Sequence, residues 1–124
     1  MHVQHTPDAR AESEFLLVLT TCGSEDQARR LARGLVEARL AACVSLVPGV
    51  ESCYRWNGAV EHDREVLLVI KTQNRSFDGV AREIRERSNY ELPEILTVPV
   101  TGGSEAYLNW LRSSLEPVTT GNAS

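Results

Sequence analysis

The sequence predicts an α+β fold in which one antiparallel sheet and its helices follow the order β-α-β-β-α-β-α. Three observations support this fold class. The segments FLLVLTT (15–21) and EVLLVIK (65–71) are apolar runs of strand length. Asn57-Gly58, the favoured two-residue hairpin turn, joins two strand-forming segments. Amphipathic helical patterns follow the first and third predicted strands.

The first strand (15–21) leads into a predicted helix that begins near Ser24. Ser24 and Gln27 have the spacing of a capping box, in which the serine accepts a hydrogen bond from the backbone three residues later. Apolar residues then recur at the i, i+3, i+4, i+7, i+8 positions of a buried helical stripe, which comprises Ala28, Leu31, Ala32, Leu35 and Val36.

A long hairpin comes next, with arms at about 41–56 and 59–72. Pro48-Gly49 predicts a bend or bulge in the first arm. Each arm would span about 45–50 Å at ~3.3 Å per residue, whereas a helix of about 14 residues covers only ~21 Å. The hairpin tip must therefore project beyond the helices, and long exposed strands favour aggregation unless they are covered. We expect another subunit to cover it; a hairpin partly folded back on itself is the alternative.

The second half of the chain completes the fold. Ser76 is expected to cap a helix with a buried face of Phe77, Val80, Ala81 and Ile84, and with Glu83 and Arg87 paired on its other side. EILTVPV (94–100) predicts a strand that Pro99 places at an edge or rim. Ser104 would cap a final helix whose apolar face is Leu108, Leu111 and Leu115. The first six elements have the ferredoxin-like βαββαβ order, with an additional C-terminal helix. We expect one domain over 15–115, a disordered tail at 1–14 and a flexible tail at 116–124.

Composition narrows the classes of function. The 124 residues include 13 basic and 17 acidic side chains, a net charge of −4, which disfavours nucleic acid as a partner. No apolar run approaches the roughly 18 residues of a membrane span. The three cysteines, Cys22, Cys43 and Cys53, form no Cys-x-x-Cys pair, which disfavours a structural zinc site and a disulfide framework. We therefore expect a cytoplasmic protein with no membrane association.

Several short segments resemble the CutA family, named for divalent-cation tolerance, and the resemblance extends from about Phe15 to Leu115. The matching segments are Leu40-Ala41-Ala42-Cys43, Tyr54-Arg55-Trp56-x-Gly58, Lys71-Thr72, Tyr90-Glu91-x-Pro93-Glu94 and Tyr107-Leu108-x-Trp110. The resemblance implies a ferredoxin-like subunit that forms a homotrimer by strand pairing between chains, similar to the PII signalling proteins. It also implies tolerance of copper and other divalent metals, with copper binding in some members and an enzyme-anchoring association in animals.

The chain departs from the family at the proposed copper ligands. Members thought to bind copper through side chains use a cysteine near the end of the first strand and a histidine pair just before the tyrosine motif. Thr20, Arg87 and Ser88 occupy these positions here, and Asn89 replaces the usual proline. None of the three side chains is a soft or imidazole ligand. The resemblance therefore does not transfer the family's copper site to this chain.

Glu91 and Glu94 are the candidate metal ligands. Leu92 precedes Pro93 and is biased towards an extended conformation, in which alternate residues point to opposite sides. Tyr90, Leu92 and Glu94 would then share one face and Glu91 the other, so one cation would need a bend or carboxylates from a neighbouring subunit. Hydrogen bonding that fixes this joint is the alternative role.

A cleft between subunits is the other candidate site, lined by Tyr54, Trp56, Lys71, Tyr90 and Trp110; an interface core is the alternative. Cys43 and His62 are expected to have structural or solvated roles, and Cys22 is the better candidate for a reactive thiol because it precedes a helix N-terminus. The glycines before Ser104 could bind an anion but more simply form a turn.

No catalytic constellation or phosphate loop is present in the sequence, so we expect no enzyme activity and no required cofactor. A divalent cation such as copper is the candidate ligand. The predicted function is divalent metal tolerance by a homotrimer. The alternatives are a PII-like sensor that binds a nucleotide or another small molecule in the clefts, and an acyl-phosphate hydrolase using Arg55.

Overall fold

The computed structural model describes residues 13–117, which form one four-stranded antiparallel sheet and three α-helices. The order along the chain is β1 (Phe15–Cys22), α1 (Glu25–Glu37), β2 (Cys43–Trp56), β3 (Ala59–Gln73), the short 3-10 turn η2 (Asn74–Ser76), α2 (Phe77–Arg87), β4 (Leu96–Pro99) and α3 (Glu105–Leu115). The strands lie in the order β2-β3-β1-β4, and the ferredoxin-like prediction is confirmed. The predicted tails lie mostly outside the described residues, so their disorder stays a prediction.

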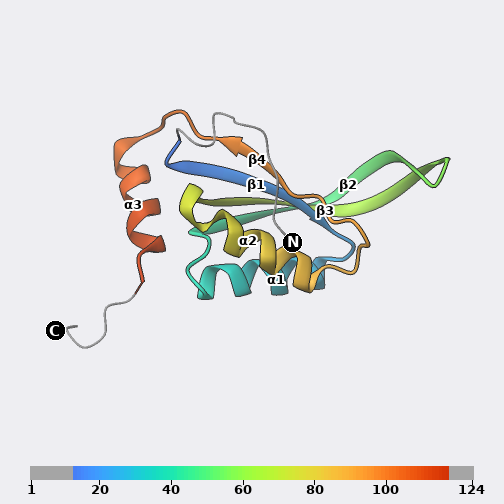
Figure 1. The fold of residues 1–124 in the computed structure, drawn as a ribbon, viewed down its shortest axis with the longest axis horizontal. Helices are drawn as coiled ribbons and strands as arrows, with labels where there is room; N and C mark the ends of the chain where they lie inside the picture. Colours follow the sequence, from blue (N-terminus) through green and yellow to red (C-terminus); the bar gives the residue numbers. More distant parts are fainter. Residues whose placement is uncertain (1–12, 118–124) are drawn as a thin grey trace.

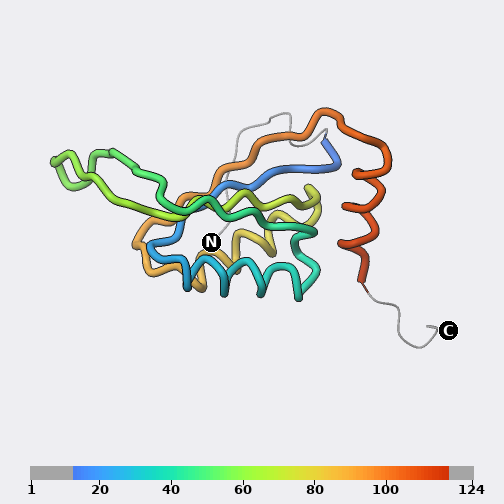
Figure 2. The backbone as a smooth tube through the Cα atoms, turned by 180° about the vertical axis from the view of Figure 1, so that it is seen from behind, coloured from blue at the N-terminus to red at the C-terminus, as the bar shows by residue number. Residues whose placement is uncertain are grey.

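Helices α1 and α2 lie side by side on one face of the sheet (Figures 1 and 2). The core between them and the sheet includes Leu16, Val18, Leu35, Leu68 and Ile84, none more than 1% exposed. Helix α3 stands at one end of the sheet (Figure 1), where Leu111 and Leu115 pack with Phe15 and Ala42 in a second apolar cluster. None of the helices within residues 13–117 is long and apolar enough to cross a membrane.

The other face of the sheet carries apolar side chains that no helix within residues 13–117 covers. Because strand residues alternate between faces, the positions between the core residues of β1 point away from α1 and α2. The paired register aligns these positions with Leu67 and Val69 of β3, and with Leu96 and Val98 of β4. Leu96 is 56% exposed and Val98 41% exposed. This helix-free face is an apolar surface that the described part of the chain leaves partly exposed.

The hairpin of β2 and β3 extends well beyond the helices, as its predicted length required (Figures 1 and 2). Its strands stay paired to the tip, where Trp56 lies opposite Ala59, so the folded-back alternative is wrong. The turn residues Asn57 and Gly58 have φ angles of 51° and 81°, as a type I′ turn requires. The pairing register shifts between Val47 and Val50, which confirms the bulge predicted around Pro48-Gly49.

The helix caps were predicted correctly in two cases of three. Ser24 accepts a hydrogen bond from the backbone N–H of Gln27, and Ser104 caps α3 in the same way. Ser76 makes no side-chain capping bond, so the third prediction is wrong. The η2 turn continues directly into α2, so Ser76 has a helical backbone conformation instead of the extended one typical of a capping residue. Val36, predicted as buried, is 42% exposed because it lies at the margin of the α1 stripe.

A candidate ligand groove at the base of the hairpin

A groove of about 770 Å³ lies where the projecting hairpin meets the segment after α2. One wall is the β2 segment 52–56, and the opposite wall is formed by residues 89–92 and Glu94. Thr21 of β1 and Glu65 of β3 also border it. The groove therefore combines three carboxylates with aromatic rings and a single arginine, and its complete lining is Thr21, Ser52, Cys53, Tyr54, Arg55, Trp56, Glu65, Asn89, Tyr90, Glu91, Leu92 and Glu94.

The polar centre of the groove is a hydrogen bond between Tyr90 and Glu65. The Tyr90 hydroxyl donates to Glu65 Oε2 at 2.6 Å, and Glu65 is only 8% exposed. Burial and the bond to this carboxylate raise the pKa of Tyr90 well above its usual value. The tyrosine therefore stays protonated over the physiological range and acts as a fixed donor to a buried acid.

Glu94 lies close enough to Glu65 for the two carboxylates to influence each other. Its pKa is raised above the usual range, first by burial and then by the negative charge of Glu65. On the hairpin, the Tyr54 hydroxyl donates to Asp63, and this bond is the main cause that raises the pKa of Tyr54 to about 12. A cation bound between Glu65 and Glu94 would offset the repulsion between their negative charges.

The segment that carries Tyr90 is held by contacts at the end of α2. Gln27 of α1 donates from its side-chain amide to the Arg87 carbonyl at 3.1 Å, and the Ser88 hydroxyl accepts from the Tyr90 N–H at 2.9 Å. Residues 90–92 then bend. The predicted strict alternation around Leu92 is therefore wrong, and the bend lets the consecutive residues from Asn89 to Leu92 all line the groove.

The structure brings together five of the seven predicted site residues: Tyr54, Trp56, Tyr90, Glu91 and Glu94. Lys71 and Trp110 lie elsewhere. Lys71 follows Glu65 by six residues along β3, a separation of roughly 20 Å in a strand, and its ammonium group lies 3.1 Å from Ser45 Oγ. Trp110 is on α3, where its ring packs against Tyr107 at a centroid distance of 5.4 Å.

Glu65 and Asp63 are functional candidates that sequence reasoning missed. Both lie on the arm of the hairpin in a charged stretch typical of a solvated strand. Only the register of β3 against β1 and the path of the segment after α2 bring Tyr90 to Glu65. The sequence offered one signal for these two residues. Alternation along β3 places both carboxylates on the same face of the strand as Leu67, so they could have been expected to share that face of the sheet.

The residues that the structure describes do not form a complete metal site on their own. Among residues 13–117, no group of three His, Cys, Asp or Glu side chains is arranged to hold a metal ion. Thr20 is buried, and its hydroxyl has no hydrogen-bond partner. Cys22 is also buried, which raises the pKa of its thiol, so its predicted reactivity as a thiolate is not supported.

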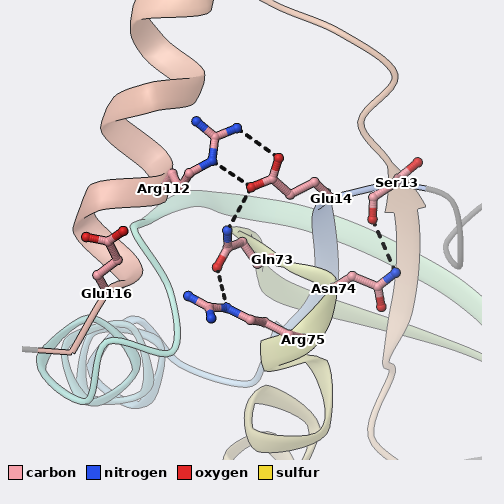
Figure 3. Close-up of a pocket in the computed structure, with 7 residues that line it drawn as sticks. All are labelled: Ser13, Glu14, Gln73, Asn74, Arg75, Arg112 and Glu116. Carbon is pink, nitrogen blue, oxygen red and sulfur yellow. Dashed lines mark hydrogen bonds and ion pairs between the residues drawn. The ribbon is translucent and has the colours of Figure 1, made fainter.

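A second pocket, of about 550 Å³, lies at the opposite end of the sheet beside α3 (Figure 3). Its polar side chains largely bond to one another: Arg112 makes two bonds to Glu14, at 2.7 and 2.8 Å, and Gln73 donates to the same carboxylate at 3.1 Å. Asn74 donates to the Ser13 carbonyl. This network fastens α3 to the start of β1 and has a structural role.

Comparisons with known proteins agree with the fold and the motifs. The family described as "CutA1 divalent ion tolerance protein" matches residues 16–114. The divalent-cation tolerance protein CutA of Thermus thermophilus is 45% identical over 98 residues, which cover 79% of this chain and 95% of that protein. The human protein CutA is 42% identical over 99 residues. This chain spans only about half of some relatives, 54% of the chloroplastic CutA of Arabidopsis thaliana and 55% of the human protein.

Solved structures extend the agreement to the backbone. A divalent cation tolerance protein from Thermus thermophilus aligns with a TM-score of 0.79 at 44% identity, covering 81% of this chain and 97% of that one. CutA from Synechococcus elongatus aligns with a TM-score of 0.80 at 41% identity, covering 84% and 92%. Since the family match spans nearly the whole described domain, the chain belongs to the CutA1 family of divalent ion tolerance proteins.

Proposed function

We propose that this protein acts in tolerance of divalent metal ions as a homotrimer, without catalysing a reaction. The observation that supports this proposal best is the groove, where three carboxylates, Glu65, Glu91 and Glu94, border one space. The relatives named for divalent-cation tolerance support the same role.

The surface of the single chain supports assembly. The helix-free face exposes apolar side chains on β4, and β2 and β4 are the two outer strands of the sheet. Outer strands with free hydrogen-bonding groups and an apolar face are normally covered in stable proteins. Pairing between the outer strands of neighbouring subunits would cover these surfaces and the projecting hairpin together. It would also bring each groove close to a second chain.

Within this assembly, Glu91 and Glu94 are the proposed metal ligands, and a neighbouring subunit would supply the remaining donors. Carboxylate oxygens suit hard divalent ions such as Mn²⁺, whereas copper prefers softer or imidazole ligands. Copper is nevertheless the first ion to test, because the family resemblance implies copper tolerance. We place the protein in the cytoplasm, although one similar solved structure, from Archaeoglobus fulgidus, is described as periplasmic.

A small-molecule sensor similar to the PII proteins is the second candidate. Arg55 and Trp56 lie in the groove wall, and a guanidinium with an aromatic ring is suited to a nucleotide phosphate and base. The opposing observation is the number of carboxylates in the same groove, which would repel an anion.

Light scattering and calorimetry test the proposal together. We expect a trimer mass at micromolar concentration, and binding of Cu²⁺ or Mn²⁺ that weakens in a Glu94→Gln variant. Glu105→Gln, on α3 outside the groove, is the matched control and should bind like the parent. A monodisperse monomer would contradict the assembly. Unchanged metal affinity in Glu94→Gln would contradict the acidic site, and nucleotide binding with metals silent would favour the sensor.

A further inference from the structure

Cys53 and His62 form a pair of side chains on the hairpin that could ligate a metal ion. Cys53 borders the groove, but the pair includes none of the groove's three carboxylates. The two residues lie directly opposite each other on β2 and β3. The Cys53 Sγ atom lies 3.6 Å from His62 Nε2. Both side chains are exposed in the single chain, and in the proposed assembly a neighbouring subunit would lie near the same hairpin.

The distance between the two atoms matches the edge of a tetrahedral zinc site. A zinc ion lies about 2.3 Å from a thiolate sulfur and about 2.0–2.1 Å from an imidazole nitrogen. At a tetrahedral angle these lengths place sulfur and nitrogen about 3.6 Å apart. The cross-strand pairing therefore holds two donors at the spacing that chelation of zinc requires, before any ion is present.

We propose that Cys53 and His62 bind Zn²⁺ or a similar thiophilic divalent ion, with two coordination positions left for water or for donors from another subunit. On binding, the Cys53 thiol releases its proton, and the thiolate sulfur and the neutral imidazole nitrogen each donate a lone pair to the ion. No third Cys, His, Asp or Glu within residues 13–117 completes the set. Such a site would exchange its ion readily.

A nucleophilic role for the same pair is less well supported. A Cys–His catalytic pair needs a third group that orients the imidazole. The neighbouring pair on the ribbon, Glu51 and Arg64, is ion-paired at 3.5 Å, so Glu51 is already engaged. Metal binding needs only the two donors at a fixed spacing, which the strand register supplies.

The experiment uses the reduced 124-residue chain with His2→Asn and His5→Asn, which removes the two other histidines of the sequence. Titration with Co²⁺, the spectroscopic probe for zinc sites, should give a thiolate-to-cobalt charge-transfer band that Zn²⁺ abolishes. Cys53→Ser should remove the band. His62→Gln should weaken Zn²⁺ binding at least about tenfold, because loss of an outer-shell partner alone costs about 10–100-fold.

Two controls separate this site from the groove and from the other thiols. Cys43→Ser removes a partly buried cysteine on the same strand and should leave the cobalt band intact. Glu94→Gln should also leave it intact, so failure of the groove proposal and failure of this one are distinguishable. Without any mutation, Zn²⁺ should protect Cys53 from alkylation, measured by mass spectrometry, and leave Cys43 unaffected. A band that survives in Cys53→Ser, or no Zn²⁺ protection of Cys53, would overturn the proposal.

Discussion

Replacing Tyr90 with phenylalanine tests whether the groove is organised by its hydrogen bond to Glu65. The substitution removes only the hydroxyl, which donates to a nearly buried carboxylate at 2.6 Å. A hydrogen bond to a charged group contributes about 1.5–3 kcal/mol. Because Tyr90 itself is half-buried, water can partly replace the lost donor. We therefore expect the lower part of this range, about 1.5–2 kcal/mol of lost stability.

For a chain of 124 residues, this loss corresponds to a fall in Tm of about 6–8 °C. The assay is thermal unfolding followed by circular dichroism at pH 7, at one fixed protein concentration because the proposed assembly would make Tm depend on concentration. Tyr54→Phe is the matched control, since its hydroxyl also donates to a carboxylate, that of Asp63, but on the exposed hairpin. The control should leave Tm unchanged.

The same variant has an alkaline signature. The pKa of Tyr90 is raised in the folded state, whereas an unfolded tyrosine ionises near pH 10. The contribution of Tyr90 is therefore complete below about pH 10 and is lost as the pH rises towards its folded value. We expect the parent to lose more stability than Tyr90→Phe above pH 10. Equal Tm values for Tyr90→Phe and Tyr54→Phe at pH 7 would refute the reasoning.

Three further substitutions test other parts of the structure. Glu94 has a raised pKa, so its negative charge opposes folding at neutral pH. Glu94→Gln should therefore raise Tm at pH 7, and this gain should disappear below about pH 4, where Glu94 is protonated in both states. A lower Tm at pH 7 would contradict this prediction. The pKa of Glu14 is lowered by Arg112, so Glu14→Gln should reduce stability at pH 7, but less as the pH falls below about 4. Equal rates of proteolysis in α3 before and after the change would argue that the hydrogen bonds between Glu14 and Arg112 do not fasten α3. Gly34→Ala should stabilise the protein by about 0.5–1 kcal/mol in urea unfolding, because alanine has the higher helix propensity. The added methyl group meets only the flexible end of the Arg87 side chain, at 3.0 Å, which can move aside. Destabilisation would mean that Arg87 cannot move.

The sequence predicted features that depend on local chemistry. Asn57-Gly58 predicted the turn because few other residues adopt positive φ at both positions. Ser24 predicted the start of α1 because its oxygen satisfies a backbone N–H that the helix leaves free. Ser76 has the same chemistry, but its position is decided by the preceding η2 turn, which propensity alone does not reveal.

The groove depended on long-range pairing and was predicted only in part. The tyrosine motif identified one wall, and the aromatic residues of the hairpin identified the other. Glu65 could not be paired with Tyr90 without the register of β3, and the bend at residues 90–92 altered which side chains face the groove. Lys71 lies outside the groove of the single chain, with its ammonium group beside Ser45, so its place in a cleft between subunits stays a prediction.

The position of the groove fits the proposal that donors from a second subunit complete the metal site. One wall is a two-stranded ribbon that projects past the helices, and an isolated ribbon of this kind is marginally stable in water. The shape of the groove therefore depends on the position of the ribbon. Burial of the apolar helix-free face would favour association with a neighbouring subunit, which would hold the ribbon in place. Binding a cation between carboxylates of two chains would then stabilise the assembly, because a ligand that binds only the assembled state shifts the equilibrium towards it. If the proposed trimer forms, metal binding and oligomerisation should therefore be coupled, and an ion that occupies the groove should raise the Tm of the protein at low protein concentration.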